Sequence, residues 1–542
     1  MPQTIAQLAV DSLISNGIEN LYCLPGVQND DFFNALYDRQ DVLRPIQSRH
    51  EQGAAYMALG AALATGKPQA FCIVPGPGFL NGCAALCTAY SLNAPLFALI
   101  GQIPSRTIGK GFGLLHEIEG QLEIMATMTK WCDRVVDGSK AVDQFHTAWT
   151  EMQSARPGPV GLEIPVDVWT TETSFDPSAL SVEPTANRAP DDSEIAAAAE
   201  LIGQAKRPLI VVGRGAQDVS AHVRSFAKEI SAGVVHFRSG QGVMRADDDQ
   251  SIGIPVAHAL WPDCDLMIGL GSRLMAQKVQ WGMDDKIKIL HIDLDPDVLT
   301  RMRAADVGIE ADLVHALPML NTAVQGQQPD RSGWLNDIRH AKERKTQEYA
   351  ENLAPQIGWL SAIRDALPDN GILVDELTQI GYVSRFAYQA FEPRTFLSSG
   401  FQGTLGWGIA AALGAALARP DVPVVSICGD GGAMFTIAEL ATARHHKIPL
   451  TVIVMNDNAY GNVRSIQRDN YQERYIASDL TSPDFVKLAE SCGVRGERAA
   501  TPDELRSVLA DAIATEEPTV IEVPQGQVPS PWEYVLLPKV RG

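Results

Sequence analysis

The fold is decided by one stretch, Val424-Val425-Ser426-Ile427-Cys428-Gly429-Asp430-Gly431-Gly432, in which an apolar strand runs into a glycine-rich turn and then a helical segment. Glycines at the carboxyl end of a strand let backbone N–H groups approach an anion, and the start of the next helix adds positive potential. The turn lacks the lysine of a P-loop. Taken alone, it fits a phosphate-binding turn or an aspartate that merely caps the following helix.

The same order of strand, glycine turn and helix occurs elsewhere in the chain. Residues 70–74 form an apolar run that meets Pro75-Gly76-Pro77-Gly78, and residues 208–212 form another that ends at Gly213. Apolar strands that alternate with helices indicate parallel sheets with crossover helices. We therefore predict an α/β protein with three doubly wound parallel-sheet domains, the central one Rossmann-like. The predicted domains are 1–168, 191–330 and 356–542, with linkers at 169–190 and 331–355.

The composition excludes several classes of protein. The 542 residues are 45% hydrophobic and 20% charged, which suits several ordinary cores and excludes a disordered or fibrous chain. A net charge of −21 disfavours binding to nucleic acid or to an anionic membrane surface. Eight cysteines are too few for a disulfide scaffold. Because we find neither a signal peptide nor an apolar run of roughly 18–20 residues, we predict a cytoplasmic protein without membrane spans.

A second acidic turn follows the next predicted strand. Met455-Asn456-Asp457-Asn458 comes directly after the apolar run 450–455. In a parallel sheet both turns emerge at the carboxyl edge, where ligands bind, so Asp430 and Asp457 are expected to converge. Two carboxylates suit Mg²⁺ or Ca²⁺, with phosphate oxygens and water as further ligands. The pair therefore predicts a diphosphate held through a divalent metal ion.

Three further motifs accompany these turns. They are Arg49-His50-Glu51, Gly76-Pro77-Gly78 with Asn81, and Gly403-Thr404-Leu405-Gly406 ahead of an alanine-rich helix. Together the motifs resemble those of thiamine diphosphate-dependent enzymes of the group that contains pyruvate oxidase, acetolactate (acetohydroxyacid) synthase and benzaldehyde lyase. Each motif is weak alone, but their order over nearly the whole chain is specific. The resemblance implies that the first domain binds the cofactor's pyrimidine and the third binds its diphosphate.

The resemblance also implies roles for individual residues. Glu51 is expected to hydrogen-bond the pyrimidine nitrogen, Leu405 to support the bent cofactor, and the Gly403 carbonyl to accept from its amino group. Asp430, Asp457 and the Ala459 carbonyl are expected to bind Mg²⁺. The further cofactor contacts that it implies are Pro25, Val74, Gly76, Pro77, Asn81, Thr378, Gln379, Gly429, Gly431, Gly432, Tyr460, Gly461, Asn462 and Val463. Each residue also has a structural interpretation, such as core packing for Leu405.

Two residues are predicted to face the substrate. His116 stands where the synthases commonly have a glutamine, and its imidazole could relay protons as a catalytic group. Gln28 stands near the position of a histidine in a lyase relative. The alternatives are a hydrogen-bonded structural histidine and a polar loop residue.

The resemblance is weakest in the central domain. Gly269-Leu270-Gly271-Ser272-Arg273 and His291-Ile292-Asp293-Leu294-Asp295 resemble segments that border FAD in the synthases. However, the methionine–histidine–glycine loop on the flavin side is not evident near 239–244. FAD is therefore a less favoured prediction than thiamine diphosphate and Mg²⁺.

The predicted function is that of an acetolactate synthase-like carboligase. The resemblance implies decarboxylation of a 2-oxo acid such as pyruvate, followed by ligation of the remaining carbon unit to a second carbonyl. A 2-oxo acid decarboxylase or carbon–carbon lyase is the main alternative, and it is favoured by His116, because decarboxylases of the group place histidines near this position. A flavin oxidase and a catalytically silent binding protein stand behind it. Because the family places Glu51 and the metal motif on different subunits, we expect a homodimer or a dimer of dimers. The run 528–532 could be a lid or could pack on a neighbouring segment.

Overall fold

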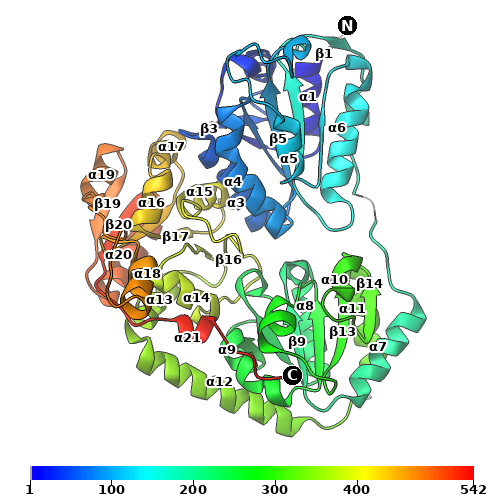
Figure 1. Cartoon of the computed structure of the whole chain (residues 1–542), viewed down its shortest axis with the longest axis vertical. Helices are drawn as coiled ribbons and strands as arrows, with labels where there is room; N and C mark the ends of the chain where they lie inside the picture. Colours follow the sequence, from blue (N-terminus) through cyan, green and yellow to red (C-terminus); the bar gives the residue numbers. More distant parts are fainter. Residues whose placement is uncertain (1–2, 185, 327) are drawn as a thin grey trace.

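The structure is a computed structural model that describes residues 3–184, 186–326 and 328–542. It contains three six-stranded sheets in which every strand pair is parallel. Figure 1 shows one sheet in the blue N-terminal part, one in the green central part and one in the yellow-to-red C-terminal part. The predicted fold class, three parallel-sheet α/β domains, is therefore confirmed.

The first sheet has the order β3-β2-β4-β5-β7-β6, which is 2-1-3-4-6-5 when its own strands are counted along the chain. Its strands are β2 (Asn20–Cys23), β3 (Arg44–Gln47), β4 (Gln69–Ile73), β5 (Leu96–Gln102), β6 (Trp131–Arg134) and β7 (Val160–Pro165). Its helices are α1 (Ile5–Ser15), α2 (Asp30–Tyr37), α3 (Glu51–Thr65), α4 (Pro77–Leu92), α5 (Gln121–Ala126) and α6 (Gly138–Gln153). A separate antiparallel pair joins β1 (Gln3–Thr4) to β8 (Glu172–Thr173).

The central sheet has the order β11-β10-β9-β12-β13-β14, which is 3-2-1-4-5-6 in its own count. That is the strand order of dinucleotide-binding folds, whose ligands lie at the carboxyl edge where the order reverses. Its strands are β9 (Pro208–Val212), β10 (Gly233–His236), β11 (Ser251–Gly253), β12 (Leu266–Leu270), β13 (Lys288–Asp293) and β14 (Val307–Glu310). Its helices are α7 (Asp192–Gln204), α8 (Ser220–Glu229), α9 (Ile254–Leu260), α10 (Pro296–Thr300) and α11 (Leu313–Val324).

The third sheet, β16-β15-β17-β18-β20-β19, repeats the order 2-1-3-4-6-5 of the first. Its strands are β15 (Ile372–Val374), β16 (Phe396–Leu397), β17 (Val424–Gly429), β18 (Thr451–Asn456), β19 (Arg495–Arg498) and β20 (Thr519–Pro524). Its helices are α13 (Ala354–Ala366), α14 (Gln379–Ala387), α15 (Gly408–Ala418), α16 (Asp430–Thr436), α17 (Glu439–His446), α18 (Gly461–Asn470), α19 (Phe485–Ser491), α20 (Pro502–Thr515) and α21 (Trp532–Val535). The shared order supports a common plan for the first and third domains.

Two segments connect the domains. Trp169, at the start of the predicted first linker, is fully buried in the N-terminal core and donates its indole N–H to the Gln28 carbonyl at 2.9 Å. The second predicted linker contains α12 (Ser332–Asn352), a long polar helix along the lower edge of Figure 1. After α21 the C-terminal tail returns to the central domain, where the Val540 N–H donates to the Trp281 carbonyl at 2.9 Å.

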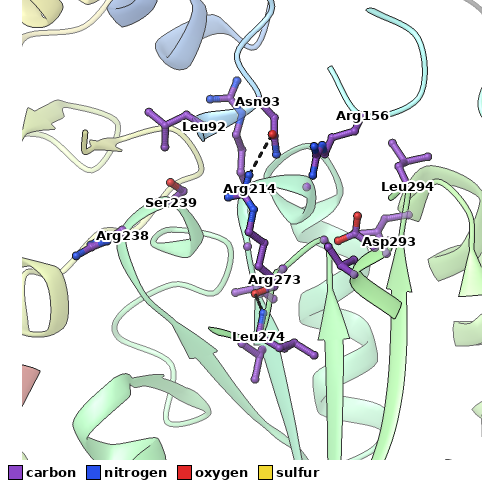
Figure 2. A pocket seen from close by; sticks show the side chains of 18 of the residues that line it. Leu92, Asn93, Arg156, Arg214, Arg238, Ser239, Arg273, Leu274, Asp293 and Leu294 are labelled. Atoms are coloured by element: carbon purple, nitrogen blue, oxygen red, sulfur yellow. Dashed lines mark hydrogen bonds between the residues drawn. The ribbon is translucent and has the colours of Figure 1, made fainter. Parts of the chain in front are cut away.

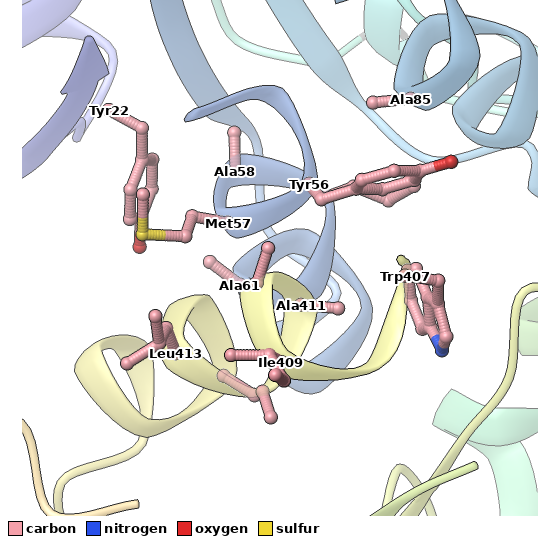
Figure 3. Close-up of a cluster of buried hydrophobic side chains, with 14 of the residues drawn as sticks. Tyr22, Tyr56, Met57, Ala58, Ala61, Ala85, Trp407, Ile409, Ala411 and Leu413 are labelled. Atoms are coloured by element: carbon pink, nitrogen blue, oxygen red, sulfur yellow. The ribbon is translucent and has the colours of Figure 1, made fainter. Parts of the chain in front are cut away.

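The N- and C-terminal domains meet through α3 and α15, which share one core (Figure 3). Both helices are rich in alanine and glycine, so their backbones come close together. A Cβ on Gly60 would lie 1.9 Å from the Ala411 carbonyl oxygen, and one on Gly414 would lie 1.8 Å from the Met57 carbonyl oxygen. Glycine is therefore required at both crossing points.

No helix in the described ranges combines the length and the apolar character that a membrane crossing needs.

Candidate active site

Glu51 is the first residue of α3, and its environment brings together several predicted residues. The α3 N-terminus is capped by His50, whose Nδ1 accepts the Gln52 backbone N–H at 3.1 Å. The Asn81 side chain donates to Glu51 Oε2 at 3.0 Å. A Cβ on Gly78 would lie 3.3 Å from Glu51 Oε1. Glu51, Gly78 and Asn81 therefore lie in one place, although their sequence motifs are separate.

The turn between β4 and α4 passes close to two other loops. Gly76 caps α4 with a φ of 60°, and a Cβ there would lie 2.3 Å from the His116 carbonyl oxygen. Val74 is buried between Gly26 and Gly78, because a Cβ on either glycine would lie 2.6 Å from one of its methyl groups. The predicted pyrimidine-side segments around Pro25, Val74 and Pro77 thus adjoin the loop that carries His116.

Gln28 and His116 form a hydrogen-bonded pair. The Gln28 side-chain nitrogen donates to the Leu115 carbonyl at 3.1 Å, so its Oε1 faces His116 Nδ1 at 2.9 Å. An amide oxygen only accepts hydrogen bonds, so Nδ1 must carry the proton. In the neutral ring the proton is then absent from Nε2, which is left as an acceptor. The geometry therefore assigns the tautomer of His116.

Asp430 and Asp457 converge at the carboxyl edge of the third sheet. Asp430 begins α16 directly after β17, is 1% exposed, and accepts a hydrogen bond from the Ser482 hydroxyl. Burial, followed by the charge of Asp430 beside it, raises the pKa of Asp457 to about 6. Two carboxylates that repel each other at a buried edge could hold a cation. The predicted convergence of the pair is present.

The neighbouring predicted residues surround this pair. Thr378 caps α14 and lies beside Gly429, where a Cβ would be 3.4 Å from its methyl group. Gln379 is buried, and its Oε1 has no hydrogen-bond partner among the described residues. A Cβ on Gly431 would lie 2.7 Å from the Tyr460 ring. The following predicted residues, Gly461, Asn462 and Val463, form the first turn of α18.

Glu376 was missed by the sequence analysis, although it links the predicted cofactor segments of this domain. Its carboxylate accepts the backbone N–H groups of Gly406 at 2.8 Å and of Gly408 at 3.1 Å, just after Leu405. A Cβ on Gly432 would lie 2.2 Å from its Oε1. Burial raises the pKa of Glu376 to about 7. Its position two residues after the end of β15 was the available signal, because ligand-site residues gather at the carboxyl ends of such strands.

Glu439 was also missed, and it connects the N- and C-terminal domains. Its carboxylate accepts the backbone N–H groups of Arg49 and His50, each at 3.1 Å, immediately before Glu51. Burial raises the pKa of Glu439. A Cβ on Gly53 would lie 2.1 Å from its Oε1. Nothing local in the sequence marks this contact, because the partners are far apart in the chain.

The residues around Glu51 form one cluster, and the residues around Asp430 and Asp457 form a second. The two clusters remain separate within one chain. The Tyr56 hydroxyl of α3 donates to the Thr404 hydroxyl, in the loop before α15, at 3.2 Å. No hydrogen bond or ion pair of the described residues joins Glu51 to Asp430 or Asp457. Within the same residues no group of three or more His, Cys, Asp or Glu side chains could hold a metal ion. A metal at the aspartate pair therefore needs ligands such as a backbone carbonyl, phosphate or water.

A cavity of about 700 Å³ lies at the carboxyl edge of the central sheet, where the strand order reverses. Figure 2 shows Arg214 and Arg273 within it and Arg156 near Asp293. Three arginines that line it, Arg214, Arg238 and Arg273, form no ion pair with a described carboxylate. Burial lowers the pKa of Arg214 to about 9 and that of Arg238 to about 10. An anionic ligand suits such a cavity.

Three family models match the chain in the order of its three sheets. Residues 3–127 match the thiamine pyrophosphate enzyme N-terminal TPP binding domain. Residues 195–320 match the central domain of these enzymes, and residues 379–523 match their C-terminal TPP binding domain. Each matched range contains most of one parallel sheet.

Curated relatives match over nearly the full length. An acetolactate synthase large subunit of Parasynechococcus marenigrum (strain WH8102) is 32% identical, with 96% of this chain and 88% of the relative covered. The acetolactate synthase isozyme 2 large subunit of Escherichia coli (strain K12) is 28% identical, with 98% and 97% covered. A probable 2-ketoarginine decarboxylase, AruI, of Pseudomonas aeruginosa is 27% identical, with 96% and 94% covered. The chain thus belongs to the thiamine pyrophosphate enzyme family and is an enzyme that uses thiamine diphosphate.

Proposed function

We propose that this enzyme is a Mg²⁺-dependent carboligase of the acetolactate synthase type. It takes pyruvate or another short 2-oxo acid, releases carbon dioxide and joins the remaining carbon unit to a second carbonyl compound. The acetolactate synthase large subunits that match over nearly the whole chain support this reaction class. The observation that carries ligation, rather than simple decarboxylation, is the hydrogen bond between Gln28 and His116.

The diphosphate-side residues fit thiamine diphosphate and Mg²⁺. The buried Gln379 Oε1 lacks a partner among the described residues, and the Asp430–Asp457 pair needs a compensating cation. We assign the metal to Asp430, Asp457 and the Ala459 carbonyl, and the diphosphate to the glycine turn 429–432. Bound thiamine diphosphate supplies the carbon nucleophile and the electron sink that decarboxylation requires.

The pyrimidine side is assigned to Glu51, Leu405 and the Gly403 carbonyl. Glu51 holds a proton at the pyrimidine nitrogen, and the Asn81 amide fixes the orientation of its carboxylate. Gly403 has a φ of 56°, a conformation that glycine adopts without strain. The Glu376 carboxylate fixes the loop that carries Leu405 through two backbone N–H groups. The role that we assign to these residues is to position the cofactor.

The tautomer of His116 favours ligation for a chemical reason. With the proton on Nδ1, the neutral ring offers Nε2 as a hydrogen-bond acceptor and not as a proton donor. Decarboxylation that ends in an aldehyde requires a proton at the reacting carbon. While the ring is neutral it supplies no such proton, and this carbon stays free for a second carbonyl compound.

A product analysis tests the proposal. The purified enzyme is incubated with pyruvate, Mg²⁺ and thiamine diphosphate, and the products are separated into acetolactate and acetaldehyde. We expect acetolactate as the main product and loss of turnover in Glu51→Gln. Acetaldehyde as the main product would support the decarboxylase alternative, which the similarity to a probable 2-ketoarginine decarboxylase also favours. The same analysis over a panel of 2-oxo acids identifies the substrate.

We further propose that the active unit is a homodimer or a dimer of dimers. Large apolar side chains are exposed on the elements that carry both clusters, which marks an association surface. They include Leu80 beside Asn81, Leu115 beside His116, and Phe435 on α16. A partner that covers these side chains would bring its own clusters next to those of the first chain.

We propose FAD as the ligand of the arginine-lined cavity in the central domain. The dinucleotide-type strand order and the volume of about 700 Å³ support a large anionic ligand there. So do the three arginines, which have no carboxylate partner among the residues that the structure describes. A yellow purified protein that releases flavin on denaturation would support this assignment. A colourless protein that binds no added FAD would contradict it without affecting the carboligase proposal.

A further inference from the structure

A second cavity, of about 260 Å³, lies between the central domain, α12 and the C-terminal domain. Its walls come from the carboxyl ends of β10 and β11, from the α12 face that carries Lys342 and Tyr349, and from α13 and the end of α14. At about 30 Å³ per water molecule this volume corresponds to roughly nine waters, which suits a small metabolite. The cavity is distinct from the arginine-lined one, although His236 lines both.

Three side chains that line the smaller cavity carry a buried polar atom without a partner in the described part of the chain. They are His236 Nδ1, Ser251 Oγ and the Tyr349 hydroxyl. Their side chains are 7%, 2% and 6% exposed. Buried polar groups are almost always hydrogen-bonded. Three unpaired polar atoms around one cavity therefore indicate that a ligand supplies their hydrogen bonds.

Two cations line the same cavity without a carboxylate partner in the described ranges. Lys342 donates to the carbonyls of Ala246 at 3.0 Å and Asp248 at 2.7 Å, which leaves one of its three N–H groups free. Burial lowers the pKa of Lys342, against the opposing influence of the carboxylates at 247–249.

Arg364 is 8% exposed and donates to the Tyr388 hydroxyl and to carbonyls, including that of Leu367. The acidic side chain in the wall, Asp365, is already paired with Arg506. Because buried charges are normally paired, Lys342 and Arg364 indicate that the cavity binds an anion.

Beside the polar Thr346, Ser361 and Gln389, the remaining wall has an apolar part. It is formed by aliphatic and aromatic side chains, namely Ile252, Val256, Ile357, Leu360 and Phe386. An anion that fills the cavity must therefore combine one charged end with a short apolar body. A carboxylate suits the polar end, because it accepts hydrogen bonds from hydroxyl and ammonium donors together.

We propose that this cavity is a binding site for a small monocarboxylate with a short aliphatic chain, held by Lys342, Tyr349 and Ser251. The site lies outside the catalytic cleft. The cavity is lined by Phe386 and Ala387 at the end of α14, whereas the predicted cofactor contact Gln379 is at the start of that helix. Binding there does not compete with the substrate.

The test uses pentanoate as the probe and calorimetry on the full-length apoprotein. The wild type is expected to bind one pentanoate per chain, and pentan-1-ol not to bind. Lys342→Met is expected to weaken pentanoate binding at least tenfold, since a hydrogen bond to a charged group is lost. Tyr349→Phe is expected to weaken it severalfold. This variant keeps the ring contacts with Phe386 at 5.1 Å and Tyr534 at 5.2 Å, so it tests the hydroxyl without unfolding the helix.

Arg344→Met is the matched control, because it removes a positive charge from the exposed face of the same helix. It should leave pentanoate binding unchanged. The proposal is overturned if the wild type does not bind pentanoate, or if both cavity variants bind it as the wild type does. Inorganic phosphate that binds more tightly than pentanoate, with the same loss in Lys342→Met, would overturn the carboxylate assignment. Since the cofactor is absent throughout, none of these outcomes depends on the catalytic proposal.

Discussion

Glu376 illustrates how a single buried carboxylate can make stability depend on pH. Its pKa is raised to about 7 by burial, so the folded protein holds this proton where the unfolded chain has released it. Its contribution to stability is present below pH 4.5 and is lost as pH rises to about 7. The free energy of unfolding of Glu376→Gln, taken relative to that of the wild type, should therefore rise by about 3 kcal/mol between pH 4.5 and about 7. Urea unfolding of the apoprotein from pH 4.5 to 8 measures the difference.

The same measurement on Glu351→Gln serves as the control, because that side chain is exposed on α12. The free energy of unfolding of Glu351→Gln should differ from that of the wild type by the same amount at every pH. A constant difference for Glu376→Gln over the whole range would show that its carboxylate is already ionised at low pH.

Burial and the neighbouring Asp430 raise the pKa of Asp457. Removal of the Asp457 charge should therefore relieve the repulsion between the two carboxylates in the apoprotein. Asp457→Asn is expected to stabilise the apoprotein at pH 8 by about 1 kcal/mol, after allowance for solvent screening of the partly exposed Asp457 side chain. Mg²⁺ should then stabilise the variant less than it stabilises the wild type. Thermal unfolding with and without Mg²⁺ compares the two. Equal Mg²⁺ shifts would remove Asp457 from the proposed metal site.

Gln28 controls the proton of His116, and this yields a prediction about products. Gln28→Glu places a carboxylate opposite Nδ1, which favours the imidazolium and gives Nε2 a proton to donate. The variant should therefore form severalfold more aldehyde relative to ligated product from the same 2-oxo acid. Gln40→Glu, on the exposed surface, is the control for the added charge. An unchanged product ratio would mean that His116 does not supply this proton.

At the scale of elements, the contact of α3 with α15 depends on two glycines. Gly60→Ala places a methyl group 1.9 Å from a backbone carbonyl, which neither helix can avoid without moving apart. We expect a loss of at least about 2 kcal/mol in stability, since overpacking of this kind is not relieved by side-chain rotation. Thermal unfolding and limited proteolysis between the domains measure the effect.

Gly203→Ala provides the matched control. Gly203 lies in α7, where a new Cβ meets no atom within 4 Å, so the substitution should leave stability unchanged or raise it by roughly 0.5–1 kcal/mol. If both variants behave alike, the close approach of α3 and α15 is not important for stability.

Local patterns explain which elements could be predicted from the sequence. The strand before Asp430 and the turn after it were predictable because an apolar run, glycines and a helix start follow one another within a few residues. The grouping of Asp430 with Asp457 was predictable because parallel strands end at the same edge. Glu439 was not, since its partners Arg49 and His50 come from another domain. Arg273 was predictable because it belongs to a segment that resembles those bordering FAD, whereas Arg214 and Arg238 were missed because they come from the loops after β9 and β10.

At the scale of the whole molecule, the same limit applies to the active site. The sequence predicts two cofactor-binding clusters, and the structure places each on its own domain without a direct link from Glu51 to the aspartate pair in the described residues. The clusters of two chains can combine only through contacts between the chains. No local pattern in the sequence of one chain specifies those contacts. In the proposed assembly a partner chain would cover the exposed side chains Leu80, Leu115 and Phe435.

A mixed dimer decides whether the site is shared between chains. Glu51→Gln and Asp430→Ala should each be inactive as homodimers. If each site takes Glu51 from one chain and Asp430 from the other, a heterodimer of the two variants has one intact site and one doubly altered site. Coexpression with two different tags and purification on both should therefore give about half of the wild-type activity per dimer. If each site were built within a single chain, every site of the heterodimer would carry one lesion, and no activity should return.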